Sequence, residues 1–503
     1  ITQKAVQKAV MNPGIINMKK VEAQQCRQVL DLLIGYTISP VLWKQISYTA
    51  GLSAGRCQTP ALRLVYDNQC EIDNDKQEQI FNIYSFFEET KDLKYDCKPV
   101  FTDGDEAEDF LMECAEYDFV ATKTKDKSTK ISPPQPFTTS ILQQTSSNNL
   151  HYSPKQTMQI AQKLYEGGYI TYMRTDAKIY SKEFIAEAKP FIKNKYGDEY
   201  FAVEERINKL STHKTQKGKA KKSGDANTQD AHEAIRPTNI TEIGSKITEK
   251  ISPQAYRLYT LIRNRTLETL MSDATQNSYT IKIKAPKERI FSTSLKLVMF
   301  DGWKIVNGFQ DDREIYELYK KIINKNSLFN LSKIHAEETL TKTSSHYTEA
   351  KLVSMLESKG IGRPSTFSSL IDKIQERNYV RKEDVEGKNI NCKQLILSMD
   401  LDKKTNEIVP SLTETFVERI IGSEKNKLVL QPIGKMVIEY LLETCDEYFQ
   451  YDYTSNMEQS LDNIENKKGI MRDICKDCDD SLQNHINKLN LKNKNDKNSL
   501  NNT

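Results

Sequence analysis

The sequence feature that most constrains the fold is a helical pattern that stops at a glycine pair, just before a short aromatic run. Ser153 and Pro154 are typical of a helix N-cap and first turn, and apolar residues then recur at helical spacing. Gly167 and Gly168 predict the end of this helix, because glycine tolerates the backbone conformations that close a helix. The residues after the glycines are therefore expected to leave from a fixed helix end.

Those residues, 169–173, are rich in aromatic and β-branched side chains and predict a short strand. Tyr172 then lies near the end of the strand, and Arg174 follows two residues later. Because residues two apart in a strand share a face, we expect the phenol and the guanidinium side by side. Such a pair could attack and hold a phosphate. Taken alone, the stretch is explained more simply by a core tyrosine beside a surface arginine.

The composition sets wide limits on the function. At 503 residues the chain can form several domains, and its net charge of +3 predicts neither nucleic acid nor a membrane as partner. No apolar run could span a bilayer, and no signal-peptide pattern occurs. Nine scattered cysteines follow no disulfide framework and are typical of a reducing, cytosolic-type compartment. Since the chain starts at Ile1 rather than Met, we expect it to be a piece of a longer protein.

Two glycine-rich turns carry arginines of the kind that hold phosphates. Arg56 lies in the first, residues 51–60, and Arg363 lies in the second, residues 360–366. Backbone N–H groups in such a turn, and at the start of the helix that follows, can bind phosphate oxygens. Most turns of this kind are only tight connections. The Gly-Lys-Ser/Thr ending of a nucleotide-binding loop is absent from the first turn, so ATP binding is not predicted.

Two further segments place charged side chains on predicted helices. Residues 21–36 are strongly helical, and Arg27 and Asp31 are spaced to form an ion pair on one face. Residues 230–237 begin like a capped helix, in which His232 and an arginine lie four residues apart. A lone histidine is usually structural, but a histidine–arginine pair at a helix start is well placed to grip an oxyanion.

Taken together, six ordered blocks resemble those of the type IA DNA topoisomerases, and most of all the bacterial topoisomerase I branch. The blocks are residues 21–36, 51–58, 134–140, 165–176, 231–237 and 360–366. They cover the chain from its start to about residue 467. The resemblance implies that Tyr172 occupies the nucleophile position of the family.

The resemblance also implies a multidomain α+β fold, with a mainly helical, toroidal core and a β-rich hinge or arch. We expect a DNA-groove domain of two segments, an arch of two segments, an inserted gate that carries the nucleophile, and a disordered tail. These parts correspond to residues 1–73 with 346–467, 74–131 with 273–345, 132–272, and 468–503.

In this family the tyrosine attacks a DNA phosphate and forms a 5′-phosphotyrosine. A strand passes through the break, and resealing without ATP relaxes negative supercoils. By position match, Arg174 is expected to hold the scissile phosphate and His232 an adjacent one. The residues implied to line the groove for single-stranded DNA are Arg27, Asp31, Tyr36, Ser53, Arg56, Gln58, Arg363 and Thr366.

The sequence departs from the family at two groove positions. Gln28 and Leu32 stand where bacterial members usually carry arginines that help to recognise a cytosine upstream of the cut. That base preference is therefore not carried over to this chain.

A larger departure concerns metals. Family members open with a metal-binding (Toprim) domain that holds Mg2+, and this sequence begins where that domain should end. We interpret Asp103-Gly-Asp105 as a turn, and Cys475 with Cys478 as only half of a zinc-site spacing. We therefore expect no metal ligands and no zinc site here. Mg2+ and the N-terminal domain would belong to the complete enzyme, and this segment alone would bind single-stranded DNA without relaxing supercoils.

The sequence allows two alternative functions. A tyrosine recombinase or type IB enzyme would place His-x-x-Arg before the tyrosine, whereas His232 follows Tyr172. A non-catalytic single-stranded-DNA-binding protein derived from a topoisomerase is the second alternative. For either the enzyme or its derivative, the expected location is cytoplasmic with the DNA, in a bacterial nucleoid or a viral or organellar equivalent, with no membrane.

Overall fold

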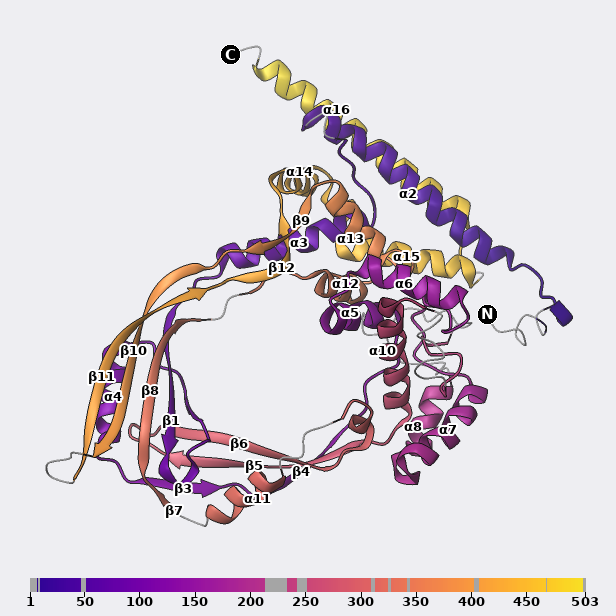
Figure 1. Cartoon of the computed structure of the whole chain (residues 1–503). Helices are drawn as coiled ribbons and strands as arrows, with labels where there is room; N and C mark the ends of the chain where they lie inside the picture. The colour runs from indigo at the N-terminus through magenta and orange to yellow at the C-terminus, as the bar shows by residue number, and fades with distance from the viewer. Residues whose placement is uncertain are drawn as a thin grey trace.

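The computed structural model describes residues 7, 10–46, 51–212, 233–241, 251–308, 313–323, 327–341, 344–401, 407–466 and 468–500, the last nine of them by their backbone alone. The described elements are arranged as a ring in Figure 1, with a long curved sheet on one side and helices on the other. This mixed, toroidal architecture confirms the expected fold class.

One antiparallel sheet of ten strands forms the arch. Its strand order is β11-β10-β8-β1-β2-β6-β5-β3-β7, and β4 pairs with β5. The bounds are β1 (Gln79–Phe87), β2 (Tyr95–Lys98), β3 (Phe119–Lys123), β4 (Lys127–Ile131), β5 (Ala274–Lys284), β6 (Ile290–Phe300), β7 (Ser327–Phe329), β8 (Leu331–Leu340), β10 (Lys388–Leu401) and β11 (Ile408–Ile421). Alternate residues of β1, such as Phe81 and Phe87, are buried in one core with α4 (Gly104–Ala115) and α11 (Arg313–Ile322).

The hairpin of β10 and β11 lies outside our expected arch, because the division above assigned all of residues 346–467 to the groove domain. In the structure β10 pairs with β8, with Gln394 opposite Glu337 and Leu397 opposite Ile334. Leu395 and Leu397 are fully buried in the arch core. Residues 388–421 therefore extend the arch sheet, and a second small sheet of β9 (Val380–Val385) and β12 (Glu424–Leu430) lies at the base of the hairpin.

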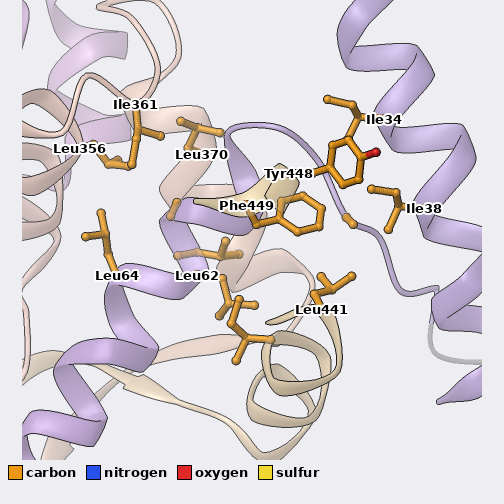
Figure 2. Packing of buried hydrophobic residues seen from close by; sticks show 14 of the residues in the cluster. Ile34, Ile38, Leu62, Leu64, Leu356, Ile361, Leu370, Leu441, Tyr448 and Phe449 are labelled. Carbon is orange, nitrogen blue, oxygen red and sulfur yellow. The ribbon is translucent and has the colours of Figure 1, made fainter. Parts of the chain in front are cut away.

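Seven described helices build the groove domain around the largest core. They are α2 (Met18–Gln45), α3 (Gln58–Asn74), α12 (Glu349–Ser358), α13 (Phe367–Glu376), α14 (Pro432–Phe449), α15 (Tyr451–Glu465) and α16 (Met471–Leu500). Figure 2 shows Ile34 and Ile38 of α2 beside Tyr448 of α14. Helices from both ends of the chain therefore share one core.

The expectation of a disordered tail at residues 468–503 is wrong for residues 471–500, because these form α16, which runs beside α2 (Figure 1). Cys478 and Leu482 are buried in the groove-domain core, and the Tyr448 hydroxyl lies 2.8 Å from that of Ser481. Apolar residues at helical spacing within a Lys/Asn-rich stretch anchor this helix.

The gate is helical and lies between the arch and the groove domain. Its described helices are α5 (Thr139–Leu150), α6 (Pro154–Glu166), α7 (Lys182–Tyr196), α8 (Glu204–Ser211) and α10 (Pro253–Leu270). Short 3-10 turns complete the described helical elements at η1 (Glu88–Thr90), η2 (Asp198–Tyr200) and η3 (Gly302–Val306). Among the described residues, no helix is both long enough and apolar enough to cross a membrane.

Candidate active site and nucleic-acid groove

Helix α6 leads directly to Tyr172. The Ser153 hydroxyl accepts a hydrogen bond from the backbone N–H of Gln156 at 3.1 Å, which caps the first turn as predicted. The helix ends at Glu166, and Gly168 adopts a φ of +77°, a conformation that favours glycine. The sequence prediction of this helix and of both its ends is therefore confirmed.

The predicted strand at residues 169–173 is wrong. Only Ile170 forms a β-bridge, to Pro237, and the rest is irregular. The backbone N–H of Thr171 donates to the carbonyl of Arg236 at 2.9 Å, and the Thr171 hydroxyl donates to the carbonyl of Ala234 at 3.0 Å. The segment thus pairs with a second irregular segment, residues 234–238, through isolated hydrogen bonds, and no continuous β-ladder forms between them.

The predicted helix at residues 230–237 is also wrong in its described part. Residues 233–237 are extended rather than helical, because Ile235 bonds to the carbonyl of Phe137 at 2.8 Å. Arg236 donates to Glu233 at 2.6 Å and its guanidinium lies 4.0 Å from the ring centre of Phe184, so it is already engaged. His232 lies outside the described residues, and its phosphate-binding role stays a prediction.

Thr139 clamps the chain on the far side of Tyr172. Its buried hydroxyl donates to the carbonyl of Met173 at 2.7 Å and accepts from the backbone N–H of Thr175 at 2.8 Å. Three of the six blocks, residues 134–140, 165–176 and 231–237, therefore meet around the tyrosine. Contacts within the fold, rather than strand geometry, position it.

Tyr172 and Arg174 occupy different environments. Tyr172 is half-buried, and its ring meets that of Tyr165 edge-on, with 5.3 Å between ring centres. Arg174 is exposed, and the buried side chain of Met173 separates them in sequence. The arginine is therefore accessible to a ligand phosphate, but no shared strand face holds it beside the phenol.

A pocket of about 530 Å3 opens in the groove domain. It lies between α2, the glycine turn at residues 51–57 and α13, and Tyr36 at its wall is 75% exposed. Five of the eight predicted groove residues line it, namely Asp31, Tyr36, Ser53, Arg56 and Gln58. An exposed aromatic ring beside cations and amides is typical of a surface on which single-stranded bases stack.

Three predicted groove arginines converge on one carboxylate that was not predicted, Glu458 of α15. Its oxygens accept bonds from Arg56 at 2.6 Å, Arg27 at 3.0 Å and Arg363 at 3.1 Å. Both Glu458 and Arg56 are only 2% exposed. The three arginines come from α2 and from the two glycine turns, so the carboxylate joins three of the six blocks.

The electrostatics of the cluster follow from this geometry. Burial alone would raise the pKa of Glu458, but the three guanidiniums lower that pKa to about 2. Asp462, one turn further along α15, lies 3.5 Å from Arg363. Burial, reinforced by the neighbouring charge of Glu458, raises the pKa of Asp462 to about 6 against the attraction of Arg363.

The remaining groove residues mostly shape the two turns. The predicted pair of Arg27 with Asp31 is not formed, because Asp31 accepts instead from Arg56 Nε at 2.9 Å. Gln58 donates to the Ser53 hydroxyl at 3.2 Å. In the second turn, the Thr366 hydroxyl accepts from the backbone N–H of Arg363 at 2.9 Å.

Comparisons with known proteins identify the family of this chain. A sequence model of the family described as DNA topoisomerase matches residues 15–395. The DNA topoisomerase 1 of Campylobacter jejuni is 34% identical over 96% of this chain and 67% of its own length. That of Helicobacter pylori is 33% identical over 93% of this chain and 61% of its own length.

Among solved structures, full-length topoisomerase I from Thermotoga maritima matches with a TM-score of 0.74 and 27% identity. The match covers 96% of this chain and 71% of that protein. The chain belongs to the type IA DNA topoisomerases. This topoisomerase chain spans 67%, 49% and 55% of three curated relatives, those of Campylobacter jejuni, Buchnera aphidicola and Rickettsia prowazekii.

Glu458 and Asp462 pair with the predicted groove arginines of this topoisomerase, and neither carboxylate was predicted from the sequence. The sequence itself offers one signal, since residues 434–466 combine a helical pattern with regularly spaced acidic side chains. Nothing in that spacing tells which carboxylate faces the arginines, because all three partners come from other, distant segments of the chain.

The residues that the structure describes do not fit a metal site. No three of their His, Cys, Asp or Glu side chains come together in a way that could hold an ion. Asp103 accepts from the backbone N–H groups of Asp105 and Glu106, so this acidic motif caps α4. Cys475 lies 3.6 Å from Cys26, sulfur to sulfur, across α16 and α2.

Proposed function

We propose that this chain is the strand-cutting and strand-holding part of a type IA topoisomerase that acts on single-stranded regions of negatively supercoiled DNA. The observation that carries the proposal is that the blocks around Tyr172 contact the helical domain that holds both the pocket and the arginine cluster. The hydroxyl of Ser140, one residue after the Thr139 clamp, donates to Glu357 of the groove domain at 2.7 Å. The proposed nucleophile and the proposed groove are therefore parts of one closed ring.

In the proposed reaction, the phenolic oxygen of Tyr172 forms a bond to a DNA phosphorus. The bond from that phosphorus to the 3′ oxygen breaks, and the leaving oxygen takes up a proton. The products are a 5′-phosphotyrosine and a free 3′ hydroxyl, and the reverse step reseals the strand without ATP. A free tyrosine has a pKa of about 10, so the phenol must lose its proton to a neighbouring acceptor. Arg174, exposed two residues away, is the proposed cation for the phosphate.

We propose that the complete protein supplies a metal-binding domain that brings Mg2+ and proton-transferring carboxylates. Bound Mg2+ would supply positive charge for the phosphate, and the described residues of this chain offer it no ligand cluster. A row of exposed apolar side chains before and at the start of α2 supports a partner at this end. These side chains are Val10, Met11, Ile15, Ile16 and Met18.

The test is covalent capture of DNA by the complete protein. With an oligonucleotide labelled at its 3′ end, we expect label to stay on the protein. Tyr172→Phe should abolish this adduct while leaving DNA affinity within about twofold, because only the nucleophilic oxygen is lost. Tyr165→Phe is the matched control, since this neighbouring ring is not the proposed nucleophile. Full adduct formation by Tyr172→Phe would refute the proposal, and so would label retained only from the 5′ end.

A further inference from the structure

A carboxylate at the centre of a phosphate-binding groove is unexpected, because it repels the proposed ligand. Glu458 is such a carboxylate, and it is ionised and almost fully buried. Its three partners are the three arginines of the proposed groove, each contributed by a different segment. Without a shared anion, three guanidiniums this close would repel one another.

Each of the two outer arginines is held at two points. Arg27 donates through one terminal nitrogen to Glu458 at 3.0 Å and through the other to Gln24 at 3.0 Å. Arg363 donates in the same way to Glu458 at 3.1 Å and to the carbonyl of Gly362 at 3.1 Å. Two fixed points set the direction in which a planar guanidinium presents its remaining donors.

Donors remain available for a ligand after these contacts. The side chains of Arg27 and Arg363 are 26% and 27% exposed, whereas that of Arg56 is 1% exposed. The Nε of Arg27 has no partner in the described chain but is shielded from solvent, so the exposed terminal nitrogens are the donors that a ligand can reach. The outer two arginines can therefore reach a phosphate, while Arg56 supports the cluster from beneath.

Helix α15 is itself fixed to the first glycine turn. The buried hydroxyl of Thr454, one helical turn before Glu458, donates to the carbonyl of Arg56 at 3.1 Å. This bond fixes the position of the Glu458 carboxylate relative to the first glycine turn, so helix and turn can move only together.

We propose that Glu458 is the positioning residue of the groove: it orients the guanidiniums of Arg27 and Arg363 toward successive phosphates of a single strand. It does not touch DNA, and it acts by pre-organising cations that would otherwise lose rotamer entropy on binding. The inference rests on the proposed binding of single-stranded DNA. It predicts that removing a negative charge from the groove weakens the binding of a polyanion, which is the reverse of what net charge predicts.

The experiment measures the affinity of the 503-residue chain for a single-stranded oligonucleotide over a series of salt concentrations. Glu458→Gln should weaken binding about tenfold at low salt, because the guanidiniums lose their shared anchor. The slope of log affinity against log salt should also become shallower by roughly one phosphate contact. Tighter binding, or an unchanged slope, by folded Glu458→Gln would overturn the inference and leave a purely structural ion pair.

Two variants keep the outcome decisive. Asp462→Asn also removes one negative charge from α15, but in the described part of the chain the Asp462 carboxylate pairs with Arg363 alone, so this variant should bind DNA equally well or more tightly. Glu458→Asp keeps the charge but is shorter by one methylene, so it cannot reach all three arginines and should weaken binding while the protein still folds. If Glu458→Gln does not fold, wild-type affinity in folded Glu458→Asp would overturn the inference. Failure of the wild-type chain to bind would instead refute the proposed function.

Discussion

At the scale of single residues, the groove contains two carboxylates one helical turn apart with opposite behaviour. Glu458 is stabilised as an anion by three arginines, which lower its pKa to about 2 against the effect of burial. Burial has the opposite net result at Asp462, which among the described residues forms an ion pair with Arg363 alone, and its pKa is raised to about 6. Both side chains lie on the same face of α15, so their location does not explain the difference. The number of arginines that pair with each carboxylate does.

The raised pKa of Asp462 has a consequence for stability. Its folded-state value of about 6 lies above the unfolded value of about 3.9, so the folded state binds more protons between these limits. Stability should therefore fall as the pH rises through that window. Asp462→Asn should remove this dependence and raise stability at pH 7 by roughly 1–2 kcal/mol. Urea unfolding of both proteins at pH 4.5 and pH 7 checks both effects. If the stability of the wild type relative to Asp462→Asn rises between these pH values, the raised pKa of Asp462 is contradicted.

At the scale of elements, sequence patterns succeeded where the signal is local. The cap and the glycine stop of α6 follow from neighbouring residues, and both were predictable. The prediction of a strand at 169–173 was wrong, because this segment makes only isolated backbone hydrogen bonds, such as the one from Thr171 to Arg236, and no continuous ladder. The β10–β11 hairpin went unrecognised, since its assignment to the arch depends on pairing with the distant strand β8.

The candidate site divides in the same way. The groove arginines could be proposed from family blocks, but their shared carboxylate could not, because Glu458 lies far from each of them in sequence. The predicted ion pair of Arg27 with Asp31 failed for the same reason: helical spacing allows the pair, but both side chains have partners from elsewhere in the fold. Local periodicity does not report such tertiary competitors.

Helix α16 gives an element-scale prediction. Its Lys/Asn-rich composition suggested disorder, yet Leu482 is 1% exposed within the groove-domain core. Leu482→Ala should lower the free energy of unfolding by about 2–4 kcal/mol, as expected for a buried leucine truncated in a packed core. Leu491→Ala on the same helix is the control, since Leu491 is 62% exposed. Equal and small effects of the two changes in urea unfolding would show that α16 does not anchor the core.

At the scale of the whole molecule, polar contacts join the proposed gate to the helices of the groove domain. Lys155 of α6 lies 3.2 Å from Asp372 and 3.9 Å from Glu376 on α13, and Ser140 bonds to Glu357 on α12. Exposed ion pairs contribute only about 0.2–1 kcal/mol each, so they can hold the gate closed and still release it. Helices α12 and α13 also flank the turn that carries Arg363, so gate and groove share a support.

Reversing the charge at this contact should shift the gate toward an open form. Lys155→Glu places like charges together, and we expect a several-fold larger open population, measured as the distance distribution between spin labels on α6 and α14. Combining it with Asp372→Lys restores opposite charges and should recover the closed distribution at least in part. A distribution that stays closed in the single variant, or that the second change does not affect, would exclude Lys155 as a latch.

The central claim is that Tyr172 becomes covalently attached to DNA in the complete protein. Tryptic cleavage after Lys163 and Arg174 releases one peptide that holds three tyrosines of this region, and tandem mass spectrometry can locate a nucleotide on any of them. We predict a 5′-phosphate linkage on Tyr172 alone. A nucleotide on Tyr165, on Tyr169 or outside this peptide, or a linkage through a 3′ phosphate, would contradict the account.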